Sequence, residues 1–121
     1  MPEIAVERVP ITTTGSAGSA TGSGITIPIN GFLLDVYLDY HASCPATADV
    51  TITEAIFGNI LVVSNNATDG WYAPRKATCD PAAAATGLYD LIPLSGPLTA
   101  SVAQANALTD CVVVTLRWIT P

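Results

Sequence analysis

Charged side chains are scarce in this 121-residue sequence. It holds ten acidic and four basic residues and a single histidine, so 12% of the chain is charged, against about 25% in typical soluble domains. Few groups are therefore available for acid-base, nucleophilic or phosphate chemistry. Only two of the basic residues, Arg75 and Lys76, are adjacent. Because nucleic-acid binding takes a basic patch, we expect no nucleic-acid partner.

Long hydrophobic runs and targeting signals are also missing. The longest apolar runs, residues 25–36 and 112–118, are shorter than the roughly 18 residues that a membrane-spanning helix needs, so we expect no membrane partner. No basic segment followed by an apolar one opens the chain, and we expect the mature protein to begin at or near Met1. The glycine-rich segment 15–18 lacks the lysine of a phosphate-binding loop. No cofactor is expected.

The three cysteines form no C-x-x-C pair, which argues against a cysteine metal site. Cys44 and Cys79 both lie in proline-containing loop sequence, so these two are the expected pair if a disulfide forms. Cys111 opens an apolar strand and is expected to be a buried thiol. Three reduced cysteines are an equally open alternative, because sequence fixes neither geometry nor compartment.

Strand patterns dominate the chain, and helix patterns are nearly absent. From Phe32 to Tyr40 every second residue is apolar, which predicts that Phe32, Leu34, Val36, Leu38 and Tyr40 share a buried face. Further strands are expected at residues 4–13, 50–54, 60–63, 88–94, 98–103 and 112–119. The predicted fold class is all-β: an antiparallel β-sandwich, jelly-roll-like, with seven or eight strands.

Residues 12–24 contain no large apolar side chain, which predicts a flexible linker. This divides the chain into residues 1–24, an N-terminal arm with a Gly/Ser/Thr linker, and residues 25–121, the β-sandwich domain. The apolar residues 4–11 either form the first strand of their own sandwich or reach a neighbouring subunit and add a strand there.

Acidic residues on one strand are the first candidate site. Asp35, Asp39 and His41 occupy alternate positions and could ligate a divalent cation together with Asp49 or Asp69 from a loop. The simpler interpretation is the solvated face of a surface strand, and we predict no metal site. With one histidine and no Gly-x-Ser-x-Gly elbow, no catalytic residue is expected either.

Residues 65–76 are the second candidate site, because they combine turn residues with two aromatic and two basic side chains. An exposed Trp71-Tyr72 pair beside Arg75 would suit an interface or a sugar-stacking platform. In the alternative interpretation Trp71 covers the core and Asp69-Gly70 is only a turn.

Three segments resemble small virion proteins of tailed bacteriophages: residues 31–40, 49–53 and 68–75. The most specific is Thr-Asp-Gly-Trp-Tyr-x-Pro-Arg, at 68–75. In size and β character the chain is similar to capsid decoration (cement) proteins. The resemblance implies a homotrimer, made in the host cytoplasm, that binds the major capsid protein on the outer surface of the virion and stabilises the shell. It carries no catalytic residues.

A structural role of this kind predicts contact residues in the N-terminal arm and in residues 65–76, which we call the tryptophan loop. These predicted interface residues are Ile4, Val6, Val9, Ile11, Trp71, Tyr72, Arg75 and Lys76. The alternative function is a carbohydrate-binding β-sandwich module that uses Trp71 and Tyr72.

Overall fold

The computed structural model describes residues 2–121, and all of its regular elements are β-strands. The eleven strands in these residues are β1 (Glu3–Ile11), β2 (Ala20–Ile25), β3 (Ile29–Tyr40), β4 (Asp49–Glu54), β5 (Gly58–Val63), β6 (Gly70–Tyr72), β7 (Lys76–Cys79), β8 (Ala85–Asp90), β9 (Ile92–Gly96), β10 (Leu98–Ala105) and β11 (Val112–Thr120). In the described part of the chain no helix is long and apolar enough to cross a membrane.

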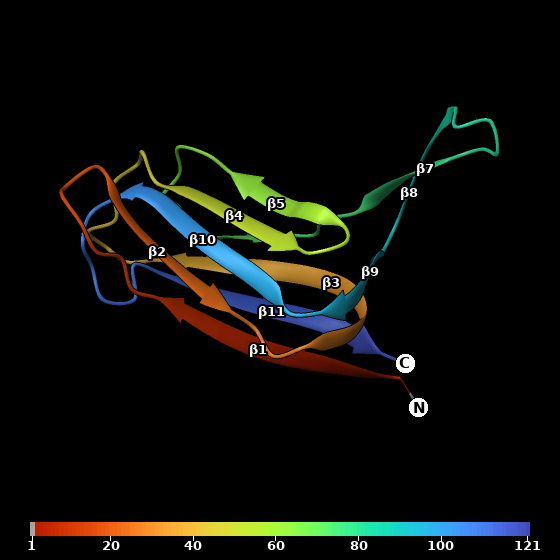
Figure 1. Cartoon of the computed structure of the whole chain (residues 1–121), viewed down its shortest axis with the longest axis horizontal. Helices are drawn as coiled ribbons and strands as arrows, with labels where there is room; N and C mark the ends of the chain where they lie inside the picture. The colour runs from red at the N-terminus through yellow and green to blue at the C-terminus, as the bar shows by residue number, and fades with distance from the viewer. Residues whose placement is uncertain (1) are drawn as a thin grey trace.

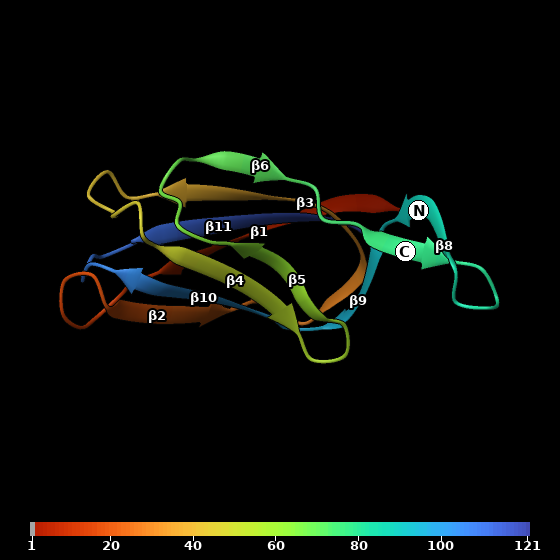
Figure 2. The ribbon, with the colours of Figure 1, turned by 90° about the horizontal axis from the view of Figure 1, so that it is seen from above.

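Two antiparallel sheets face each other as a jelly-roll-like sandwich (Figure 1). The first has the order β1-β11-β3-β6, with β9 also paired to β3, and the second has the order β2-β10-β4-β5. The turned view shows the two layers separated along most of their length (Figure 2). The predicted all-β sandwich is confirmed. The predicted number of strands is too low, because β2, β6 and β7 lie in segments whose composition is typical of linkers or loops.

Small aliphatic side chains fill the space between the sheets. Val36, Leu38 and Leu116 of the first sheet and Ile52 and Val102 of the second are almost completely buried. Sheets in such a sandwich pack about 10 Å apart, a spacing that valine, leucine and isoleucine fill well. The aliphatic composition of the chain is therefore explained by a thin core.

Strand β3 departs from the alternation that the sequence predicts. The expected buried face is correct for Val36, Leu38 and Tyr40, but Phe32 is 46% exposed and Leu33 is buried in its place. The pairing with β11 shifts register between Arg117 and Trp118, so β3 has one extra residue there. Such a bulge exchanges the two faces of the strand, which a strict two-residue period cannot anticipate.

The N-terminal segment belongs to the sandwich. Strand β1 pairs with β11 along its whole length, so of the two alternatives for residues 4–11 the structure has the first. The flexible linker predicted for residues 12–24 is wrong, because residues 20–25 form β2 beside β10.

The glycines of this segment allow a close approach between β1 and β2. A Cβ atom on Gly22 would collide with the carbonyl oxygen of Thr12, and one on Gly24 would collide with Val9. A sequence that resembles a linker by composition is thus required by packing.

Strands β7 and β8 form a hairpin that extends from one end of the sandwich, the end at which both termini lie (Figures 1 and 2). Every residue of β8 is exposed. The single strand predicted for residues 88–94 is divided between this hairpin and β9, which returns to the first sheet. The chain then passes from β9 in the first sheet to β10 in the second.

Candidate functional site

The solvent side of the first sheet, which we call the outer face, brings together five of the candidate residues: Ile4, Val6, Asp35, Asp39 and Trp71. Their positions follow from the strand register, since opposed residues share a face. The outer face consists of Ile4, Val6, Arg8 and Pro10 of β1; Val113, Thr115, Arg117 and Ile119 of β11; Phe32, Asp35, Tyr37 and Asp39 of β3; and Trp71 of β6.

An aromatic platform lies across three strands of the outer face; we define it as Trp71, Tyr37 and Arg117. Trp71 is directly opposite Tyr37, and the two ring centroids are 4.8 Å apart with the rings tilted by 48°. The guanidinium carbon of Arg117 lies 4.8 Å from the centroid of the Trp71 ring. Trp71 nevertheless remains 56% exposed. The indole is thus held by two neighbours while much of it faces solvent.

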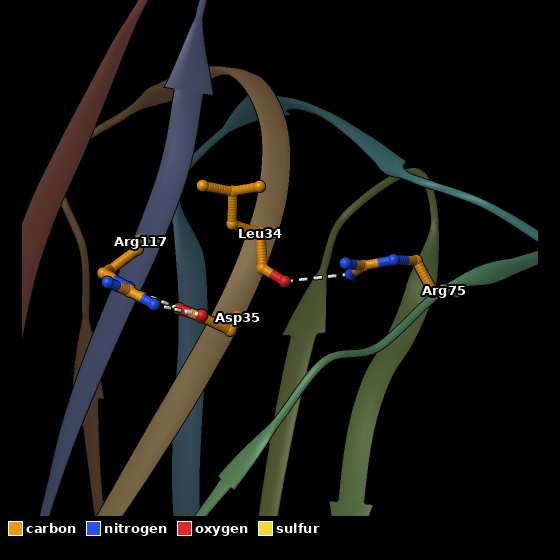
Figure 3. A network of polar contacts seen from close by, with 4 residues as sticks. All are labelled: Leu34, Asp35, Arg75 and Arg117. Atoms are coloured by element: carbon orange, nitrogen blue, oxygen red, sulfur yellow. Dashed lines mark hydrogen bonds and ion pairs between the residues drawn. The ribbon is translucent and has the colours of Figure 1, made fainter.

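Arg117 is itself fixed by Asp35, its opposite residue on β3 (Figure 3). Its Nε donates to Asp35 Oδ1 at 2.7 Å, and its second terminal nitrogen donates to Oδ2. This hydrogen-bonded pairing raises the pKa of Arg117, and the Asp35 charge adds to the effect. A two-point contact of this kind holds the guanidinium in one plane. The position of Arg117 beside the Trp71 ring is therefore fixed.

Strand β6, which carries Trp71, is positioned by the loop before it. Asp69 Oδ1 accepts a hydrogen bond from the Tyr40 amide at 2.7 Å, and Asn66 Nδ2 donates to the Tyr40 hydroxyl. Burial raises the pKa of Tyr40. After the strand, Arg75 donates to the Leu34 carbonyl oxygen at 2.9 Å (Figure 3). Both ends of this three-residue strand are therefore tied to β3.

The predicted interface residues divide between the surface and the core. Ile4 and Val6 are 62% and 58% exposed on the outer face. Val9 and Ile11 are buried in the chain's own core, which corrects their assignment to a contact surface. Val9 and Ile11 lie on the same strand as Ile4 and Val6, but their side chains point into the sandwich.

The predicted interface residues of the tryptophan loop also divide between the surface and the core. Trp71 is exposed, so the interpretation of Trp71 as a cover over the core is wrong. Tyr72 points inward and packs against the core, and it shares no surface with Trp71. Arg75 is exposed beside β3, and Lys76 begins the hairpin.

Two residues of the platform, Tyr37 and Arg117, were not among the predicted site residues. They become neighbours of Trp71 through the order of the strands in the sheet, which the sequence does not show. Desolvation raises the pKa of Tyr37, and the nearby carboxylates of Asp69 and Asp39 add to the shift.

The candidate metal ligands do not come together. Asp35 is paired with Arg117, Asp39 is exposed, and His41 Nδ1 accepts a hydrogen bond from the Ser43 amide. Within residues 2–121 no group of three potential ligands is placed to hold an ion. The described residues also enclose no pocket, so a ligand of the outer face would meet an open surface.

The cysteines are arranged differently from the expected pairing. Cys44 and Cys111 are both buried, with their sulfur atoms 3.7 Å apart. Cys79 is exposed on β7, at the opposite end of the sandwich from the β3–β4 loop that carries Cys44 (Figure 1). The predicted partnership of Cys44 with Cys79 is therefore wrong, whereas the prediction that Cys111 is a buried thiol is confirmed.

Comparisons with protein-family models and with curated sequences find no match. Among solved structures, the chain is similar to a family two carbohydrate esterase from Cellvibrio japonicus, with 15% identity and a TM-score of 0.38 over 98% of this chain. It spans 33% of that esterase.

Two further structures are carbohydrate-binding modules. The C-terminal CBM6 of LamC, a laminarinase from Zobellia galactanivorans, is 6% identical, with a TM-score of 0.40 over 98% of this chain and 100% of the module. TmCBM61, solved with β-1,4-galactotriose, is 5% identical, with a TM-score of 0.40 over 98% of this chain and 86% of that one. Likenesses at these scores assign the chain to no family.

Proposed function

We propose that this protein is a non-catalytic binding module whose outer face binds carbohydrate, with the Trp71 indole as the stacking surface. The observation that carries the proposal is that Trp71 is exposed and yet held in place by Tyr37 and Arg117. An aromatic ring that is ordered before binding loses little conformational freedom when a ligand stacks on it. Its exposed surface also offers a large apolar contact.

Polar groups border the platform and supply hydrogen-bonding partners for sugar hydroxyls. Arg8 and Thr115 lie in the same row across the sheet as Tyr37 and Trp71, and Asp39 follows Tyr37 on β3. Arg8 and Asp39 are both exposed. Because the two rings are tilted by 48°, they do not form one flat surface, and we expect a sugar ring to stack on Trp71 with Tyr37 at its side.

The experiment is binding of the full chain to a panel of soluble and immobilised polysaccharides, with two matched variants. Trp71→Ala removes the stacking surface. Tyr89→Ala removes a more exposed aromatic, 70% against 56% for Trp71, from the hairpin, away from the outer face. The proposal expects the first variant to lose at least about tenfold in affinity, since a stacked ring contributes about 1.5 kcal/mol or more, and the second to bind like the wild type. Equal binding by both variants, or no binding to any glycan, would overturn it.

A second candidate function is supported by a different observation, the apolar surface at the hairpin end of the molecule. Ile4 and Val6 are exposed there, and Leu88 and Tyr89 on the hairpin are 67% and 70% exposed. An isolated two-stranded hairpin is marginally stable in water. Contact with another subunit would cover these side chains and support the hairpin.

We propose, as this second candidate, a self-associating capsid decoration protein that binds the major capsid protein on the outer surface of a phage virion. Its test is the molar mass of the full chain in solution together with its co-sedimentation with purified phage shells. A trimer that binds shells, and a Leu88→Ser/Tyr89→Ser variant that does not, would support this function. A monomer that co-sediments with none of the shells tested would contradict it.

A further inference from the structure

Two buried thiols lie side by side at the end of the sandwich opposite the hairpin. Cys44 is in the loop between β3 and β4, and Cys111 directly precedes β11. Their sulfur atoms are 3.7 Å apart, although 66 residues separate them in the sequence. Cys111 is fully buried, and Cys44 is 9% exposed. Neither thiol takes part in the outer face.

The backbone holds the two cysteines together independently of their sulfur atoms. The His41 amide donates to the Cys111 carbonyl oxygen at 2.8 Å, and the Cys44 amide donates to the His41 carbonyl oxygen at 2.9 Å. Tyr40 and Val112, the residues next to this junction, are paired in the sheet. The approach of the two sulfur atoms therefore follows from the sheet register and the turn.

We propose that Cys44 and Cys111 are the two halves of a disulfide that forms by exchange with a low-molecular-weight disulfide such as oxidised glutathione. In the first step the Cys44 thiolate attacks one glutathione sulfur, and a glutathione thiolate leaves. In the second step the Cys111 thiolate attacks the Cys44 sulfur of the mixed disulfide, and the second glutathione leaves. Two protein thiols are oxidised, one glutathione disulfide is reduced to two thiols, and the two protein protons pass to the leaving thiolates.

Burial determines when this reaction is efficient. Because thiol–disulfide exchange requires the thiolate, the raised pKa of the Cys44 thiol, to about 12 by desolvation and by its contact with Cys111, slows attack in the folded reduced protein. We therefore expect rapid oxidation while the chain refolds and slow oxidation once the sandwich has closed. Cys79, exposed on β7, is accessible throughout.

The position of the aspartates makes the pairing directly measurable. After refolding with oxidised and reduced glutathione, free thiols are alkylated under denaturing conditions and the chain is cleaved before aspartate. Cys44, Cys79 and Cys111 then fall in three different fragments, residues 39–48, 69–79 and 110–121. The proposal expects fragments 39–48 and 110–121 joined, with a loss of about 2 Da for the two hydrogen atoms that oxidation removes, and fragment 69–79 alkylated.

A second readout is thermal unfolding of a Cys79→Ser variant with and without reductant. The cross-link closes a long loop, so reductant should lower the melting temperature by roughly 10 °C. A Cys44→Ala/Cys79→Ser/Cys111→Ala variant is the control and should not respond to reductant. Three alkylated cysteines after oxidative refolding would overturn the proposal, as would a link between fragments 39–48 and 69–79.

Discussion

The sandwich and the β7–β8 hairpin are built from similar residue types but are stabilised in different ways. In the sandwich, apolar side chains from two sheets cover each other, and residues such as Leu38 are completely buried. In the hairpin, Leu88 and Tyr89 project into solvent, and Thr78 contacts Thr86 across the pair at 2.6 Å. Apolar residues in the sandwich therefore contribute to folding, whereas those in the hairpin are available for contact with another molecule.

The sharpest test of this difference is the same substitution made in both regions. Leu38→Ala should lower the free energy of unfolding by about 3 kcal/mol, since it removes buried methyl groups and leaves a cavity. Leu88→Ala should change it by less than about 0.5 kcal/mol, as expected for an exposed site. Urea unfolding measures both. If the two variants lose similar stability, the hairpin packs against its own chain in a way that the structure does not show.

Substitutions in β2 test whether this glycine-rich edge strand is part of the folded sandwich. Gly22→Ala should cost about 2 kcal/mol, because its new Cβ must displace the Thr12 backbone. Ser23→Ala, one residue away and exposed, should cost less than about 0.5 kcal/mol. Equal stability of the two variants would mean that residues 20–25 behave as the flexible linker that their composition indicates.

The pH dependence of stability tests the buried thiol at the other end of the sandwich. In the reduced protein the pKa of Cys44 is raised to about 12, above the value of about 8.5 for an unfolded chain. The folded state therefore favours the neutral thiol. This stabilisation is complete below about pH 8.5 and is lost as the pH rises toward 12.

Urea midpoints in the presence of reductant, measured from pH 7 to 11, should fall more steeply for the wild type than for Cys44→Ala. Tyr40, whose pKa is raised mainly by burial, is present in both proteins. Parallel curves would show that Cys44 ionises equally well in the folded and unfolded chains.

The smallest effect is expected from removing the hairpin. Replacing residues 77–89 with a short Gly/Ser turn should change the melting temperature of the isolated chain by no more than about 3 °C, since few buried contacts are lost. The same replacement should abolish assembly if the hairpin contacts another subunit. A large loss of stability in the isolated chain would assign the hairpin to the folded core.

Strand patterns and the sandwich class could be predicted from the sequence, because alternation and turn residues are local signals. The alternation fails at Phe32 and Leu33, where the bulge in β3 depends on its pairing with β11. Strand β2 is also not predicted, since the glycines that permit its close approach to β1 give the segment the composition of a linker. Both misses depend on contacts between distant segments.

The candidate site shows the same limit. Trp71 could be singled out by residue type, but Tyr72 was expected to accompany it because the two are adjacent. In a strand, adjacent residues point to opposite faces, and the neighbour of Trp71 is instead Tyr37, 34 positions earlier in the chain and opposite it in the sheet. Likewise Cys44 lies beside Cys111 because the β3–β11 pairing brings their segments together.

The central claim, that the exposed Trp71 ring is the binding surface of the outer face, can be tested through its fluorescence. In a Trp118→Phe variant Trp71 is the remaining tryptophan, since the chain has two. Titration with a polysaccharide that the chain binds should shift its emission to shorter wavelength and protect it from quenching by acrylamide. An indole that stays fully quenchable in the saturated complex would contradict the claim.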